Sequence, residues 1–352
     1  MSTVTKTEVG IVDAVVHPSF PKDDDIVQYL PEAYQLRGFP GQTRYYYSRL
    51  EGEFHESAYL EDQRAGSDRQ RVEEVIFAES GVGVAILLPL TRGLMADRRL
   101  GSAICTATNS WLSEEWLSGE PNRFRGSIRV DPDDVEGALV EIERWADDPR
   151  MVQIAVPLEA LHPYGQPVYF PIWAAAAKNG LPVAVQSDGG AGVDYAPSGT
   201  GYPRHYIEFA SLQSLRFFYH LASLITEGVF DRLPEVRFVF ADGGADVLPP
   251  LMWRLDSAWR QARSQSPENR HVPSSYLAEN VWFATSRLEG PTSHGLEKEW
   301  ADTMRTYDHL LYGSHYPHWS FEPPDDRAMR TAPEERRRVL GGHATTLYRL
   351  SM

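Results

Sequence analysis

Short apolar runs rich in β-branched residues recur along the chain, and turn residues follow most of them. A strand that is apolar at nearly every position, and not only at alternate ones, is covered on both faces, as parallel strands are. Eight such runs are found, at residues 11–18, 82–89, 124–130, 151–158, 181–190, 236–244, 280–286 and 309–315. The hydrophobic pattern therefore predicts eight parallel strands.

Segments with helical spacing of apolar residues separate most of these runs. Residues 133–148 join the third and fourth strands, with Asp131 or Asp133 as the expected N-cap. A helix from Phe170 to Asn179, with Gly180 as its C-cap, joins the fourth and fifth. Alternating strands and helices with right-handed crossovers close naturally after eight units. We therefore predict a (β/α)8 TIM barrel that forms a single domain over residues 1–352.

Two long segments interrupt this alternation, at residues 19–70 after the first strand and 187–207 after the fifth. Loops of this length in a compact domain are commonly lids or binding loops. Both follow strands at the same end of the barrel, and both contain several tyrosines. We expect these segments to cover an organic ligand.

The charge of the chain narrows the choice of partners. The 352 residues include 49 acidic and 34 basic side chains, a net charge of −15, which disfavours nucleic acid and anionic membranes. No stretch approaches the roughly 18 apolar residues of a membrane span. The single cysteine, Cys105, excludes an intrachain disulfide, and the N-terminal residues carry no apolar leader. We expect a cytoplasmic protein whose partner is a small-molecule substrate.

Polar side chains stand at the ends of four predicted strands. In a barrel of this kind the C-terminal strand ends meet at one mouth, where the working residues lie. Their convergence favours a functional site over coincidence, and we predict that His17, Asp242 and His315 are catalytic. The predicted substrate-binding residues are Gln186, Asp188, His205, Tyr206, Tyr316, His318 and Trp319.

Several segments between residues 10 and 350 resemble the amidohydrolase superfamily. Among them are IVDAVVHP at the first strand, GGADVLPPLMWRLDSAWR after the sixth and LLYGSHYPHW at the eighth. The chain looks most like the amidohydrolase-2 group, which includes metal-dependent decarboxylases related to aminocarboxymuconate-semialdehyde decarboxylase. The resemblance implies an amidohydrolase-like barrel with a mononuclear divalent-metal site at its mouth.

Three positions depart from the pattern that this resemblance implies. The family carries an acidic residue or His on the first strand, a His on the fifth and an Asp on the eighth. At these positions this chain has Val15, Gln186 and His315. His17 and Asp242 match. Because the changes remove ligands and negative charge, we expect no cofactor. If Zn²⁺ or another divalent metal is bound, its ligands are expected to be His17, Asp242 and His315.

A site without metal would depend on acid–base chemistry. His17 and His315 would divide the general acid and base roles, Asp242 would orient one imidazole, and Gln186 would donate to a substrate oxygen. The leading hypothesis is a metal-independent lyase, cyclase, isomerase or dehydratase, with secondary metabolism as a setting. One alternative is a metal-dependent decarboxylase or hydrolase with an unusual ligand set. Another is a non-catalytic pseudoenzyme that binds a small molecule or stabilises a partner. Relatives often dimerise, so a homodimer is expected.

Overall fold

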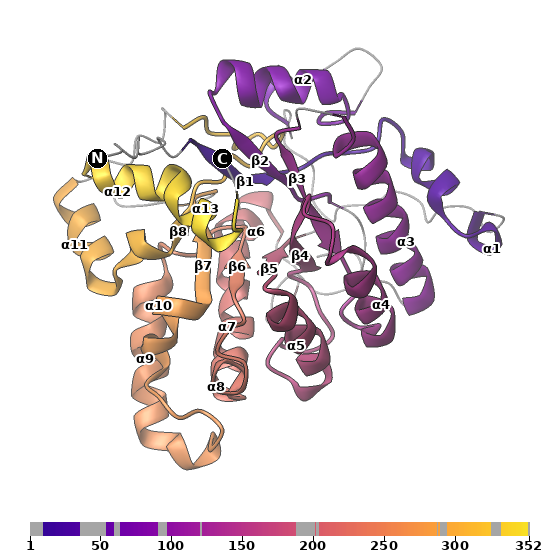
Figure 1. Ribbon diagram of the computed structural model, residues 1–352. Coiled ribbons are helices and arrows are strands. Elements are labelled where there is room, and N and C mark those ends of the chain that lie inside the picture. Colours follow the sequence, from indigo (N-terminus) through magenta and orange to yellow (C-terminus); the bar gives the residue numbers. More distant parts are fainter. Residues whose placement is uncertain are drawn as a thin grey trace, which may run out of the picture.

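The computed structural model describes residues 10–35, 54–59, 64–90, 97–119, 122–187, 201, 204–286, 288, 294–324 and 332–350. Within these ranges the strands form an inner wall and the helices lie outside it (Figure 1). The central parts of the two predicted lids, residues 36–53 and 188–200, lie outside the described residues.

Eight parallel strands hydrogen-bond to one another in chain order. They are β1 (Val12–Val16), β2 (Val84–Leu87), β3 (Phe124–Arg129), β4 (Met151–Pro157), β5 (Val183–Gln186), β6 (Phe238–Phe240), β7 (Val281–Ala284) and β8 (Leu310–Leu311). The wall returns to its start after β8, because Ala14 N–H donates to the Tyr312 carbonyl and His315 N–H donates to the Val15 carbonyl. The predicted (β/α)8 barrel is confirmed.

Helices connect the strands and cover the outside of the wall (Figure 1). Those before β5 are α1 (Glu32–Gln35), α2 (Arg69–Glu73), α3 (Arg98–Trp111), α4 (Val135–Trp145) and α5 (Phe170–Asn179). Those after β5 are α6 (Tyr206–Leu212), α7 (Phe217–Thr226), α8 (Val229–Arg232), α9 (Leu248–Ala262), α10 (Leu277–Asn280), α11 (His294–Met304), α12 (Pro333–Arg337) and α13 (His343–Leu347).

The strands divide the apolar residues between two cores, since successive side chains on a strand point to opposite faces. The larger core lies between the wall and the helices and takes residues such as Ile128 and Val130. The smaller core fills the barrel interior. Ala344 in helix α13 and Tyr348 directly after it belong to this interior core together with Val12 at the start of β1. The α13 segment therefore closes the N-terminal end of the barrel.

The ends of two helices test the predicted caps. Gly180 ends α5 in the left-handed conformation, with φ of 63°, as predicted. The N-cap of α4 is Asp134, whose carboxylate accepts the N–H of Gly137 at 3.2 Å. The prediction of Asp131 or Asp133 was wrong because both carboxylates are engaged elsewhere. Asp131 accepts the N–H of Asp133 at 3.0 Å, and Asp133 accepts the Tyr169 hydroxyl at 2.6 Å.

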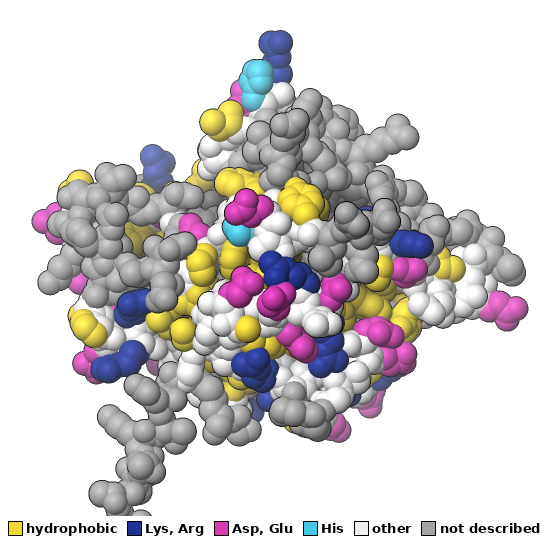
Figure 2. Space-filling view, turned by 90° about the horizontal axis from the view of Figure 1, so that it is seen from above, with side chains coloured by type: hydrophobic (Ala, Val, Ile, Leu, Met, Phe, Trp, Pro, Cys, Tyr) yellow, Lys and Arg dark blue, Asp and Glu magenta, His cyan; other side chains and the backbone are white. Residues whose placement is uncertain are grey.

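The surface agrees with the composition as far as the described residues show it. Acidic and basic side chains are interspersed among the coloured residues of the face in Figure 2. None of the described helices has the length and apolar character needed to cross a bilayer. The cytoplasmic location and the homodimer stay predictions.

Asp13 joins the first and last strands of the barrel. The side chain is fully buried, and its Oδ1 accepts the N–H of Val15 at 3.1 Å and the N–H of Ser314 at 2.9 Å. Burial raises the pKa of this carboxyl to about 6, although the hydrogen bonds from Ser314 and Val15 oppose the shift. The charged form therefore costs more in the folded protein than in the unfolded chain.

We expect Asp13→Asn to reduce the pH dependence of stability. A folded-state pKa of about 6, above the ordinary value of 3.8, means that protonation favours the folded state below pH 4. This contribution is lost as the pH rises to 6, an effect on the order of 3 kcal/mol for one carboxyl. Denaturant unfolding of both proteins between pH 4 and 7 measures it. The free energy of unfolding of the variant should rise relative to that of the native protein as the pH increases over this range. The same dependence on pH in both proteins would contradict a raised pKa at Asp13.

Candidate active site at the C-terminal mouth of the barrel

His17 follows β1 and lies at the mouth, where it is almost fully buried. Its Nδ1 lies 2.8 Å from the carbonyl oxygen of Leu88, after β2. A carbonyl only accepts, so Nδ1 carries the proton and Nε2 is the basic nitrogen of the neutral ring. Metal-binding and catalytic histidines are commonly oriented in this way, by one ring nitrogen bonded to the backbone.

His315 enters the same space from the end of β8. Its backbone is in the left-handed region with φ of 64°, which costs a residue with a side chain about 1–2 kcal/mol. Its ring meets that of His17 edge-on, with centroids 5.1 Å apart and planes at 76°. Nδ1 lies 2.9 Å from the Ser320 hydroxyl, and Nε2 lies 3.8 Å from Oδ1 of Asp242. The strained backbone thus places one imidazole between another imidazole and a carboxylate.

Asp242 comes from the end of β6 and completes this group. Its Oδ2 accepts the N–H of Ser187, the residue after β5. Gly243 and Gly244 follow with φ of 81° and 104°, and a Cβ at Gly244 would overlap the ring of Phe217. The sharp turn that aims the carboxylate therefore requires glycine.

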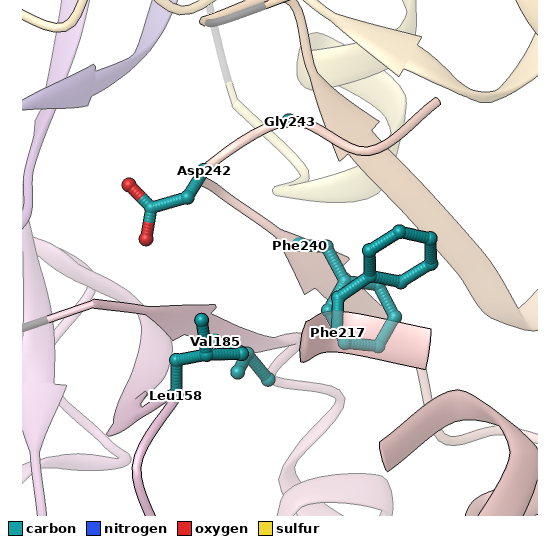
Figure 3. Close-up of a pocket in the computed structure, with 6 residues that line it drawn as sticks. All are labelled: Leu158, Val185, Phe217, Phe240, Asp242 and Gly243. Carbon is teal, nitrogen blue, oxygen red and sulfur yellow. The ribbon is translucent and has the colours of Figure 1, made fainter. Parts of the chain in front are cut away.

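An apolar wall lies behind the Asp242 carboxylate. Leu158, Val185, Phe217, Phe240 and Gly243 line a cavity of about 10 Å³ beside it, room for about one water molecule. In Figure 3 the carboxylate points away from the rings of Phe217 and Phe240. Low polarity on one side strengthens the interaction of the carboxylate with groups on the other.

Gln186 is the last residue of β5 and is fully buried. Its Nε2 lies 3.4 Å from the carbonyl oxygen of Pro89, so the amide is oriented by the loop after β2. Its Oε1 has no hydrogen-bond partner among the described residues. An acceptor buried in this way is costly unless something binds it.

The structure brings some of the other predicted site residues close to this group. The ring of His318 contacts that of His315 in a tilted arrangement, with centroids 4.4 Å apart and planes at 33°, and its Nδ1 lies 2.8 Å from the same Ser320 hydroxyl. Trp319 is 44% exposed and contacts His318. Tyr316 is fully buried and pairs with Val16, so it belongs to the barrel closure.

The remaining predicted residues follow β5. His205 is exposed, and its N–H donates to Glu208 at 3.4 Å. No contact between His205 and the histidines at the mouth is found among the described residues. Tyr206 begins α6, and its side chain lies outside the described residues, as does Asp188.

Two charged residues near the mouth were not predicted from the sequence. Glu159 is almost fully buried beyond β4, pairs with Arg216 and lies 3.4 Å from the Ser187 hydroxyl. Arg129 is the last residue of β3 and is fully buried. The signal was present in both cases, as a charged residue inside or directly after an apolar run.

The described residues contain no group of three His, Cys, Asp or Glu side chains already arranged to hold a metal ion. His315 Nε2 and Asp242 Oδ1 are 3.8 Å apart. Two ligand atoms on one ion, each about 2.1 Å from it, are about 3.0–3.4 Å apart. The two atoms are therefore too far apart to share one metal ion, and His315 is not counted among the ligands.

Comparison with known proteins gives one family and a consistent fold. Residues 82–350 match the model of the amidohydrolase family (Amidohydro_2). An amidohydrolase from Mycobacterium avium subsp. paratuberculosis K-10 is similar over 97% of this chain and 99% of its own, with 20% identity and a TM-score of 0.76. No curated protein matches the sequence.

Decarboxylases of dihydroxybenzoates have the same fold. A 2,6-dihydroxybenzoate decarboxylase in complex with 2,6-dihydroxybenzoate is 21% identical, covers 97% of this chain and 100% of its own, and has a TM-score of 0.70. A dihydroxybenzoic acid decarboxylase from Polaromonas sp. JS666, with bound manganese and the inhibitor 2-nitroresorcinol, is 19% identical with a TM-score of 0.68. Its alignment covers 97% of each chain.

The bound manganese contradicts the expectation of a site without a cofactor. That expectation counted Gln186 as a lost ligand. In the structure its Oε1 is a buried amide oxygen without a hydrogen-bond partner among the described residues, and amide-type oxygens suit Mn²⁺. An oxygen donor therefore stands where the family resemblance implies an imidazole. With His17 and Asp242, the residues present fit a hard divalent cation.

The turn after β6 provides a test of how Asp242 is positioned. Gly244→Ala should lower the free energy of unfolding by about 1–2 kcal/mol for its positive φ and a further 1–3 kcal/mol for crowding against Phe217. Gly81→Ala is the matched control, because Gly81 has φ of 69° and a Cβ added there would meet no atom within 4 Å. Denaturant unfolding compares them.

Phe217→Leu should recover part of the loss in the Gly244→Ala background, because the smaller side chain relieves the overlap. Equal losses in Gly244→Ala and Gly81→Ala would show that Phe217 does not fix this turn.

Proposed function

The chain belongs to the amidohydrolase family, and on this basis we propose that it is a metal-dependent decarboxylase of a small aromatic carboxylic acid. The observation that carries the proposal is the meeting of His17, Asp242 and His315, from three strands, at the mouth of the barrel. Structures with the same fold are decarboxylases of dihydroxybenzoates, which supports this class of reaction over the hydrolysis of an amide.

Three residues would hold the metal in this proposal. His17 would use Nε2, since Nδ1 is bonded to the Leu88 carbonyl. Gln186 would use its buried Oε1, and Asp242 its carboxylate. They follow or end β1, β5 and β6, and imidazole and oxygen donors together suit Mn²⁺. A bound divalent ion supplies a Lewis acid that stabilises negative charge on substrate oxygens.

His315 is left to handle the proton. Loss of CO2 breaks the bond between the ring carbon and the carboxylate, and the electron pair stays on the ring carbon. A proton must then reach that carbon, and the imidazolium of His315 is placed to deliver it from Nε2. Ser320 fixes the orientation of the ring through Nδ1, and Nε2 lies 3.8 Å from Asp242.

Removal of metal should abolish the reaction. We expect chelated and dialysed protein to release no CO2 from a panel of hydroxybenzoates, and Mn²⁺ to restore release from the substrate. Elemental analysis should find about one equivalent of metal per chain in the active protein. Full turnover by protein shown to be free of metal would refute the proposal.

Replacement of His315 should slow the chemical step more than binding. For His315→Gln we expect kcat to fall about 10²- to 10⁴-fold, the usual contribution of a positioned proton donor, with KM changed only a few-fold. His162→Gln, at an exposed histidine, is the control and should retain its activity. Steady-state kinetics separates the two constants. A large rise in KM at unchanged kcat would assign His315 to binding and not to proton transfer.

A further inference from the structure

Arg129 is a buried charge inside the barrel. Its neighbours along β3, Ile128 and Val130, belong to the core between the wall and the helices. Because successive side chains alternate, Arg129 and Ser127 face the interior. The contacts of Ser127 agree, since its hydroxyl donates to Leu87 on β2 and accepts from Gln153 on β4. An arginine at such a position replaces the apolar side chain that a barrel interior ordinarily takes.

The register of the strands gives the height of Arg129 in the barrel. In eight-stranded barrels of this type, residues at one height advance by about one position per strand relative to the hydrogen-bonded register, and odd strands share a layer. Val16 pairs with Leu87 on β2, and Leu87 pairs with Gly126 on β3, so His17, one residue further on, is in register with Ser127. An advance of one position for each of the two strands leads from Ser127 to Arg129. His17 and Arg129 therefore lie in the same layer.

The same count continues to β5. Arg129 pairs with Ala155, and Val156 pairs with Val185, so the advance leads to Gln186. The backbone of Arg129 therefore lies in the same layer as His17 and Gln186. The nearby interior residues Ala155 and Ala184 are small, which leaves room for a long side chain.

Arginine at this height has a defined chemistry. Its guanidinium stays charged in proteins and offers five N–H donors in a planar fork that matches a carboxylate. Its charge acts towards the mouth, because it lowers the pKa of Asp131, which burial raises to about 7. A fork of this kind can bind an acidic side chain and a ligand at once.

We propose that Arg129 is a specificity-determining residue that binds the carboxylate of the substrate. The ligand class is a small aromatic acid in its anionic form, whose carboxylate would bind the guanidinium of Arg129 beside His17 and Gln186. The identity of this carboxylate as the group that leaves rests on the proposed function. The binding of the anion does not, so the two ideas can fail separately.

The test measures binding, with 2,6-dihydroxybenzoate and its uncharged amide as probes. Isothermal titration of the Mn²⁺-loaded full chain compares the native protein with Arg129→Met and Arg129→Lys. Arg129→Met leaves the buried Asp131 without this positive neighbour, so its fold is checked by circular dichroism, and Arg129→Lys, which keeps the charge, serves as the second variant. Arg125→Met is the matched control, because Arg125 is on the same strand but near its start and is bonded to Asn122 and Phe124.

We expect Arg129→Met to weaken binding of the acid at least about tenfold, the usual effect of losing a charge-assisted pair, and to leave binding of the amide unchanged. Arg129→Lys should fall between, since it keeps the charge but loses the fork. Arg125→Met should bind both probes as the native protein does.

Two results would overturn the proposal. One is native-like affinity of Arg129→Met for the acid, and the other is a native protein that does not prefer the acid to the amide. If the acid binds through Arg129 but no hydroxybenzoate loses CO2, the anion site stands and the proposed decarboxylation fails. If CO2 is released and Arg129→Met binds normally, the decarboxylation stands and the anion site fails.

Discussion

The hydrogen bond that the Asp13 carboxylate accepts from the backbone N–H of Ser314 joins β1 to the segment that follows β8. His17 follows one of these strands and His315 the other. Their rings meet at 5.1 Å only because β1 and β8 lie side by side. The geometry of the site therefore depends on the closure of the barrel, and the buried carboxyl that fastens it is as much a part of the site as the imidazoles.

The rest of the mouth is held by polar contacts between neighbouring strand ends. Ser187 donates its N–H to Asp242, and its hydroxyl lies 3.4 Å from Glu159, which pairs with Arg216. This chain of contacts crosses from β4 to β6 and reaches the start of α7. A buried pair of this kind contributes little net stability, but it restricts the orientations of the groups around it. The position of Asp242 is thus set by residues that need not touch the substrate.

The sequence was sufficient to predict the barrel, because the apolar runs mark strands that are covered on both faces. It also predicted Gly180 as a cap, since a helix that ends in the left-handed conformation favours glycine. The cap at Asp134 was missed because three aspartates stand within four positions, and the sequence does not show that Asp131 bonds to the Asp133 N–H and Asp133 to the Tyr169 hydroxyl. The convergence of His17, Asp242 and His315 followed from the rule that strand ends share a mouth. The cofactor did not follow, because the identity of Gln186 says nothing of whether its oxygen is engaged.

The helix that closes the N-terminal end of the barrel has a consequence for the order of folding. The interior core includes Val12 and Tyr348, which lie far apart in the sequence. A ribosome must therefore synthesise everything from Val12 to Tyr348 before this interior can be sealed, and such distant contacts form slowly. His315 also lies far from His17 in the sequence, so the two rings meet only after β8 has been made and has paired with β1. The arrangement of the site therefore forms late in folding.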